Sequence, residues 1–135
     1  MDDAMASAPT SPRGGRLLVA DDEPHIRRIL TTLLEMSEYT VDAVSDGTAA
    51  LELLAGAVHY DLILLDIMMP GATGLEVLDR LRALPTRAGT PVMILTAKGQ
   101  DADRDRAYEL GAADFVTKPF SPKKLLARIA QLLTQ

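Results

Sequence analysis

Short apolar runs alternate along this chain with longer segments in which apolar residues recur at helical spacing. The clearest run spans residues 62–65 and stops abruptly at Asp66, as expected of a strand that is buried on both faces and ends at the rim of a sheet. Other apolar runs predict four further strands, at residues 17–20, 41–44, 92–95 and 114–117. The chain therefore has five candidate strands, distributed along most of its length.

A helical segment follows each of the five runs, and several of these segments begin or end at residues that favour helix termini. Pro24 suits the first position of a helix, where its missing N–H costs nothing, and Asp46 and Ser121 suit the N-caps of two others. Gly56 and Gly111 are expected to end helices. The predicted helices begin at Pro24, follow Asp46, span residues 74–84 and 101–110, and follow Ser121.

The strict alternation of strand and helix predicts an α/β fold: a five-stranded parallel sheet with right-handed crossovers and helices on both faces. In such a sheet the carboxyl ends of all strands lie at one edge, where α/β proteins bind their ligands. Because polar residues follow four of the strands, we expect side chains distant in sequence to converge on one site there. These residues are Asp21 and Asp22, then Asp66, Thr96 and Lys118.

Length, charge and composition limit the classes of function. A chain of 135 residues suits one domain, expected over residues 16–135, behind a flexible tail at residues 1–15 that is rich in Ala, Ser, Pro and Gly. A net charge of −5 with scattered basic residues argues against direct contact with nucleic acid. Cysteine is absent, no apolar run approaches the ~20 residues that span a bilayer, and no signal peptide is evident. We therefore expect a soluble, cytoplasmic protein without membrane contact.

The residues at the expected site favour phosphoryl chemistry. The carboxylates of Asp21, Asp22 and Asp66 would repel one another when held close together, and a divalent cation is the simplest compensation. Hard oxygen ligands without His or Cys favour Mg²⁺ or Mn²⁺ over zinc. Lys118 and Thr96 supply an ammonium and a hydroxyl that suit phosphoryl oxygens. Asp66 is best placed as the nucleophile that would form an aspartyl phosphate.

Taken together, these motifs resemble one known family, the receiver domain of two-component response regulators. The resemblance covers residues 16–135, and although each motif alone is weak, their joint spacing is specific. It implies a strand order of 2-1-3-4-5, which places Asp22 and Asp66 on either side of the topological switch point. The motifs are Asp21-Asp22, Asp66 with Met-Met-Pro-Gly at residues 68–71, Thr96-Ala97 and Lys118-Pro119-Phe120.

The resemblance also implies how this site is used. Asp66 is the phosphoacceptor, and it receives its phosphoryl group from a phosphohistidine on a sensor histidine kinase or a phosphotransfer protein. The carboxylates of Asp22 and Asp66 and the backbone carbonyl of Met68 bind Mg²⁺, while Asp21 acts mainly through water. The protein is then no enzyme in the usual sense, because it catalyses only its own phosphorylation and dephosphorylation.

A switch is implied as well. Thr96 moves to bond the phosphoryl group, Lys118 pairs with that group, and Phe115 is the switch aromatic that rotates inward when Thr96 moves. The peptide bond between Lys118 and Pro119 is expected to be cis. The face built from the fourth helix, fifth strand and fifth helix then changes its affinity for a downstream protein or output domain.

Two variable positions are expected to border the phosphoryl site. Met68 lies two residues after the acceptor and Lys98 two residues after Thr96. In the family such positions tune how quickly water reaches the acyl phosphate. A bulky, apolar Met68 should shield it, which predicts a phosphorylated state that lasts longer than it would with a small polar residue.

The last helix resembles receivers that dimerise through the same face to control DNA-binding domains, with Asp114 and Arg128 forming one ion pair of that interface. Lys124, however, replaces an acid that would face the base at Arg104, and Ala113 replaces another common acid. Like charges across an interface oppose association, so the case for this dimer is weakened. We expect a monomer or a phosphorylation-dependent dimer.

Several alternatives remain open at this stage. The chain is either a free-standing regulator or a receiver fragment of a larger DNA-binding transcriptional regulator. A phosphohydrolase with an aspartyl nucleophile would share Asp66, but such enzymes generally carry a second acid where this chain has Met68. A flavodoxin-like electron carrier would share the fold, but the acids at residues 21–23 would repel a flavin phosphate. A receiver that never accepts phosphate would not need the complete acidic set.

Overall fold

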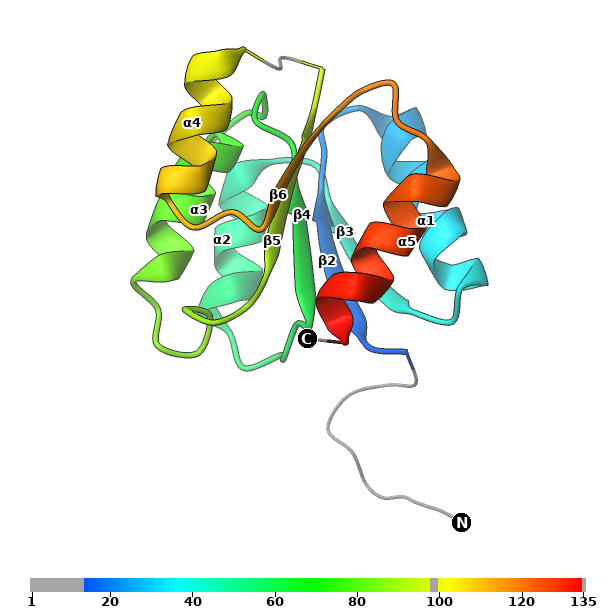
Figure 1. Cartoon of the computed structure of the whole chain (residues 1–135). Coiled ribbons are helices and arrows are strands. Elements are labelled where there is room, and N and C mark those ends of the chain that lie inside the picture. The colour runs from blue at the N-terminus through cyan, green and yellow to red at the C-terminus, as the bar shows by residue number, and fades with distance from the viewer. Residues whose placement is uncertain (1–13, 98–99, 135) are drawn as a thin grey trace.

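The computed structural model describes residues 14–97 and 100–134, which form a parallel five-stranded sheet between two layers of helices (Figure 1). The strand order is β3-β2-β4-β5-β6, which is 2-1-3-4-5 in order of appearance, and every adjacent pair is parallel. Both the α/β class and this order are therefore confirmed. The strands are β2 (Arg16–Ala20), β3 (Thr40–Val44), β4 (Leu62–Leu65), β5 (Val92–Thr96) and β6 (Asp114–Thr117).

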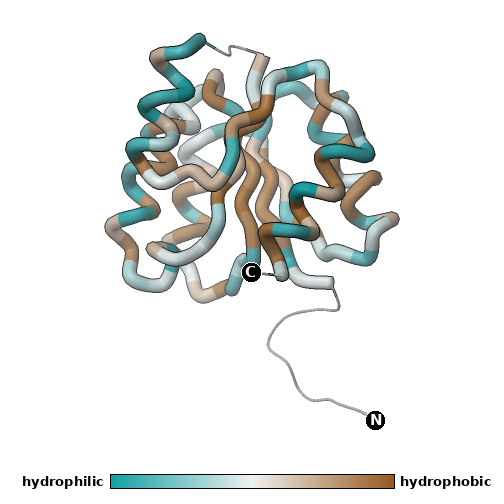
Figure 2. The backbone as a smooth tube through the Cα atoms, in the orientation of Figure 1, coloured by the Kyte–Doolittle hydropathy of each residue, from teal (hydrophilic) through white to brown (hydrophobic). Residues whose placement is uncertain are grey.

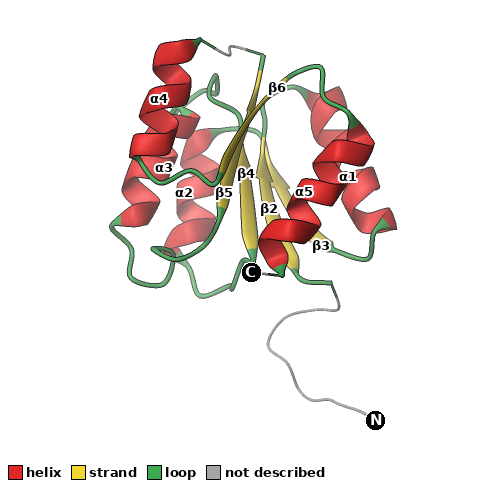
Figure 3. Cartoon of the chain, in the orientation of Figure 1, coloured by secondary structure: helices red, strands yellow, loops and turns green. Residues whose placement is uncertain are grey.

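Helices cover both faces of the sheet (Figure 3). One face is covered by α1 (Pro24–Met36) and α5 (Pro122–Leu133), and the other by α2 (Gly47–Ala55), α3 (Gly74–Arg82) and α4 (Asp101–Glu109). Each face has its own apolar cluster, and the side chains of β4 alternate between the two. All four residues of β4 are buried, as their unbroken apolar run predicts.

Local sequence accounts for most of the helix ends. Asp46 accepts a hydrogen bond from the Ala49 N–H (2.7 Å) and Ser121 accepts one from the Lys124 N–H (3.2 Å), so both predicted caps are present. The third helix ends at Arg82 instead of residue 84, because Pro85 disfavours helical backbone in the residue before it. The fourth helix likewise ends one residue before the predicted position, at Glu109.

The hydropathy of the backbone changes sharply where the central strands end (Figure 2). Apart from Arg16 and Thr96, the residues of β2, β4 and β5 are apolar, and an aspartate directly follows both β2 and β4. Thr96 is the last residue of β5 and not, as predicted, the first residue after it. Among the helices of the described residues, none is both long and apolar enough to cross a bilayer.

Candidate functional site

The carboxylates of Asp21, Asp22 and Asp66 meet at the carboxyl edge of the sheet. Ala20 and Leu65 are partners in adjacent strands, and the residue after each is an aspartate. The Asp66 N–H donates to the carbonyl of Ala20 (2.9 Å), which continues the ladder and fixes the two acids side by side. Each of the three aspartates offers a carboxylate oxygen within 4.8 Å of the others. The predicted convergence therefore holds for all three acids.

The start of α3 packs against the backbone at Asp66. Gly74 lies so close to the carbonyl of Asp66 that a Cβ atom at this position would overlap the oxygen. Its N–H donates to the carbonyl of Ile67 (3.0 Å), and a capping box between Thr73 and Glu76 begins the helix. Asp66 is therefore held both by its strand and by the helix that follows.

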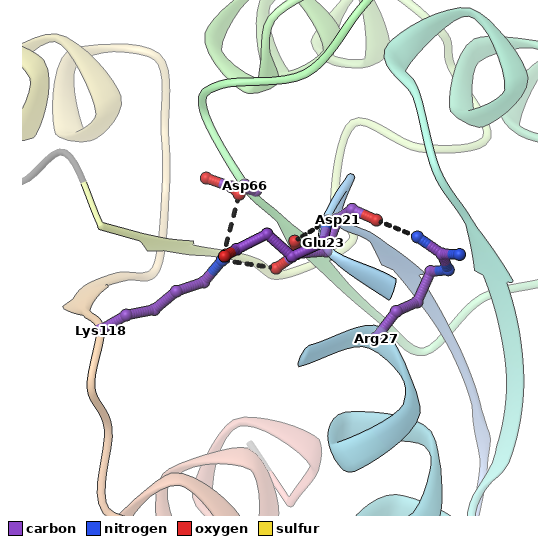
Figure 4. Close-up of polar contacts among 5 residues, drawn as sticks. All are labelled: Asp21, Glu23, Arg27, Asp66 and Lys118. Atoms are coloured by element: carbon purple, nitrogen blue, oxygen red, sulfur yellow. Dashed lines mark hydrogen bonds and ion pairs between the residues drawn. The ribbon is translucent and has the colours of Figure 1, made fainter. Parts of the chain in front are cut away.

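Lys118 reaches the acids from the loop between β6 and α5 (Figure 4). Its Nζ lies 2.8 Å from Asp21 Oδ2, 3.1 Å from Asp66 Oδ2 and 2.8 Å from Glu23 Oε1. The peptide bond between Lys118 and Pro119 is cis, and the Lys118 N–H donates to the carbonyl of Thr96 (2.9 Å). One ammonium group thus serves three carboxylates that come from two different strand ends.

Burial and charge act against each other in this cluster. Burial raises the pKa of Asp21, and the hydrogen bond from Lys118 only partly offsets that effect. Burial alone would lower the pKa of Lys118, but its hydrogen bonds with Asp21, Glu23 and Asp66 outweigh burial and raise the pKa. The hydrogen bond from Lys118 also lowers the pKa of Glu23. Lys118 is therefore held in its charged form, while the ionised form of Asp21 is disfavoured.

One carboxylate oxygen in the site has no hydrogen-bond partner within the described part of the chain. Asp66 Oδ1 is buried, and no donor among the described residues reaches it. Such an orphaned acceptor is costly unless a cation or another group satisfies it. A pocket of about 210 Å³ adjoins it, lined by Asp22, Glu23, Asp66, Met68, Thr96 and Ala97. The orphaned oxygen and the all-oxygen donor set fit a hard divalent cation such as Mg²⁺.

The other predicted site residues lie around this pocket or beside it. Thr96 is fully buried and lines the pocket, and Met68 lines it with 54% of its surface exposed. Phe115 is buried in β6 next to Ile94 of β5, and the Arg104 guanidinium lies 5.4 Å from the centre of its ring. Lys98 lies outside the described residues.

Two residues of the site were not assigned a role from the sequence. The sequence marks Glu23 only as one of the acids at residues 21–23, yet it binds Lys118, 95 residues away. Arg27, one helical turn later, donates to the backbone carbonyl of Asp21 (2.8 Å; Figure 4). Neither contact has a signal in the sequence, because Arg27 binds a backbone carbonyl and Glu23 binds a residue far along the chain.

Comparison with known proteins decides what kind of domain carries this site. The family model described as "Response regulator receiver domain" matches residues 17–130. The chain belongs to this family. The receiver domain is also similar to longer proteins: over 118 residues it is 43% identical to the transcriptional regulatory protein ResD of Bacillus subtilis. That match covers 87% of this chain and 48% of ResD, so the chain spans about half the length of this curated relative.

Solved receiver domains have the same fold. A CheY-like response regulator receiver domain protein from Methanospirillum hungatei superposes with a TM-score of 0.83 at 26% identity, covering 88% of this chain and 93% of that one. The BeF3-activated DrrB receiver domain superposes with a TM-score of 0.79 at 31% identity, covering 89% and 97%. The family and the class of function expected from the motifs, a two-component signalling switch, are therefore confirmed. The phosphohydrolase alternative is not favoured.

Proposed function

We propose that Asp66 is the phosphoacceptor of this receiver domain and that its donor is a phosphohistidine on a sensor histidine kinase or a phosphotransfer protein. The observation that carries the proposal is the orphaned Oδ1 of Asp66, which adjoins a pocket while Oδ2 is held by Lys118. A fixed carboxylate with an acceptor oxygen available is suited to attack phosphorus. Among the three clustered aspartates, Asp66 is the one that is buried and also lines the pocket with Thr96 and Met68.

The transfer needs no further reactant. An oxygen–phosphorus bond forms at the Asp66 carboxylate as the phosphorus–nitrogen bond to the donor histidine breaks, and the imidazole, protonated on its other ring nitrogen, leaves as a neutral group. Lys118 and the Thr96 hydroxyl stabilise the phosphoryl oxygens. Asp21, Asp22, Asp66 and the backbone carbonyl of Met68 would hold Mg²⁺, or Mn²⁺, which neutralises negative charge on the phosphoryl group.

We place the output of the switch on the face formed by α4, β6 and α5. Phe115 lies in β6 next to the strand that ends at Thr96, so a shift of Thr96 has a short path to this face. A groove of about 500 Å³ runs between β6 and α5, and Phe115, Lys124 and Arg128 are among its lining residues. Since ResD is a transcriptional regulator about twice as long as the matched segment, an output domain that controls transcription is the partner we propose.

The charges on this face bear on the predicted dimer. Arg128 Nε donates to Asp114 Oδ2 within the same chain (2.9 Å), so this pair does not need a second copy. Lys124 lines the groove and would meet Arg104 of another copy with like charge. These contacts favour a monomer before phosphorylation and leave dimerisation to the phosphorylated state.

The proposal is tested by incubating the protein with Mg²⁺ and acetyl phosphate and measuring its intact mass. We expect a gain of one phosphoryl group in the parent and none in Asp66→Asn. Asp79→Asn, an exposed acid on α3, is the matched control and should gain the same mass as the parent. A phosphoryl gain that persists in Asp66→Asn, or its absence from the parent, contradicts the assignment.

A further inference from the structure

Glu23 is the exposed one of the three acids that bind Lys118 (Figure 4). Its side chain is 55% exposed, whereas those of Lys118 and Asp66 are 7% and 5% exposed. It nevertheless lies as close to Lys118 Nζ as Asp21 does, at 2.8 Å. The group of carboxylates that could hold a cation consists of Asp21, Asp22 and Asp66 and does not include Glu23. Its contact with Lys118 therefore needs an explanation separate from metal binding.

The lysine ammonium has no donor to spare in this arrangement. An ammonium group carries three N–H donors, and three carboxylates accept from Lys118 Nζ. A phosphoryl group on Asp66 would need at least one of these donors. Asp21 and Asp66 follow adjacent strands and are held by the sheet, so neither can move away without disturbing it. The Glu23 side chain can turn into water, where an exposed ion pair is worth little.

The backbone of Glu23 is held even though its side chain can move. The Glu23 N–H donates to Asp21 Oδ1 (3.0 Å), and Arg27 holds the Asp21 carbonyl from one helical turn further on. Glu23 is also the N-cap residue of α1, but its side chain makes no capping hydrogen bond. Release of the carboxylate from Lys118 would therefore leave the acid-bearing turn in place.

We propose that Glu23 is the exchangeable counter-ion of Lys118: it binds the ammonium in the resting site and gives up that place to the phosphoryl group. This inference rests on the proposed function of Asp66 and adds a positioning residue to it. Glu23 competes with the incoming anion for the same donor. The site therefore takes up a phosphoryl group less readily than it would without Glu23.

The test measures binding of beryllofluoride, a phosphoryl analogue, by calorimetry at saturating Mg²⁺. We expect Glu23→Gln to bind the analogue up to about fivefold more tightly than the parent, the size of an exposed ion pair. Glu23→Asp keeps the charge but is one methylene shorter, so it should lose the contact and show a smaller gain. Glu52→Gln removes an exposed glutamate on α2 and should match the parent.

A second readout needs neither metal nor analogue. The ¹⁵N-ammonium signal of Lys118 should shift in Glu23→Gln and Glu23→Asp and stay unchanged in Glu52→Gln. The inference is overturned if this signal does not move in the Glu23 variants, or if Glu23→Gln binds beryllofluoride only as tightly as the parent. It is also overturned if Glu23→Gln binds more tightly but Glu23→Asp binds like the parent, because the effect would then depend on charge alone and not on the contact. If the parent is phosphorylated on Asp66 but the Glu23 variants behave like it, only this inference fails. If the parent accepts neither phosphoryl group nor analogue, the proposed function fails with it.

Discussion

The two edges of the sheet use similar charged residues in opposite ways. At the carboxyl edge, Lys118 serves three carboxylates and an oxygen of Asp66 has no hydrogen-bond partner among the described residues. At the amino edge, the buried Arg87 donates to the carbonyls of Leu54 (3.0 Å) and Gly56 (3.1 Å) and stacks over the ring of Tyr60. The carboxyl edge therefore has more hydrogen-bond acceptors than donors, whereas at the amino edge donors and acceptors are closely matched.

Arg82 repeats this pattern beside Arg87. Its guanidinium donates to five backbone carbonyls in two loops, so one side chain joins the end of α3 to the segment after α4. Arginines bound by backbone carbonyls at one edge and crowded carboxylates at the other indicate different roles. We conclude that the amino edge stabilises the fold, whereas the carboxyl edge gives up stability for binding. The carbonyls are those of Arg87, Ala88, Thr90, Leu110 and Gly111.

The largest effect is expected at the amino edge. Arg87→Met should lower the free energy of unfolding by about 3 kcal/mol, because the carbonyls of Leu54 and Gly56 lose their donor and Tyr60 loses its cation. Urea unfolding monitored by circular dichroism measures it. Arg28→Met removes an exposed arginine from α1 and should change stability by less than about 0.5 kcal/mol. Equal effects of the two substitutions would refute the stabilising role of the amino edge.

At the carboxyl edge, a divalent cation should supply the missing stability. Mg²⁺ at about 100 times its Kd should raise the free energy of unfolding by about 2.7 kcal/mol, because it binds only the folded protein. Asp22→Asn removes an exposed acid of the cluster and should abolish most of this gain. Thermal unfolding with and without Mg²⁺ is the measurement. If the stability of the parent protein does not respond to Mg²⁺, the carboxyl edge does not give up stability for cation binding.

The third effect concerns pH and has a definite sign. The pKa of Asp21 is raised by burial above its ordinary value of 3.8, so the folded state holds this proton more tightly than the unfolded state does. The stability of the metal-free protein therefore falls as pH rises from the unfolded pKa through the folded one, and ionised Asp21 opposes folding at pH 7.

Asp21→Asn cannot ionise, so it should raise the free energy of unfolding of the metal-free protein at pH 7 by about 1 kcal/mol. The gain should shrink as the pH is lowered through the raised pKa of Asp21, because the parent then also carries an uncharged side chain at this position. Urea unfolding at several pH values is the measurement. A gain that grows on acidification, or a less stable variant at pH 7, would show that Asp21 is better placed as an anion.

The sequence predicted the carboxyl edge better than the amino edge, for physical reasons. Apolar runs located all five strands, and parallel topology then brought Asp21, Asp66 and Lys118 together without any knowledge of side-chain positions. Backbone carbonyls carry no sequence signature, so the partners of Arg82 and Arg87 could not be predicted from the sequence. The same is true of Glu23, because its contact depends on the path of a side chain across 95 residues.

The smallest expected effect concerns Met68, the exposed side chain at the pocket beside Asp66. Met68 lines the pocket beside Asp66, and we predict that its thioether side chain shields an acyl phosphate there from water. Met68→Asn places a smaller polar group there, so dephosphorylation of the protein should become about threefold faster, a change below 1 kcal/mol in the barrier. Loss of the phosphoryl group is followed by intact mass after acetyl phosphate is removed.

Met36→Asn, the same substitution at a side chain that is 77% exposed at the end of α1, is the control and should leave the rate unchanged. An unchanged or slower rate in Met68→Asn would mean that Met68 does not shield the site and that water reaches Asp66 by another route.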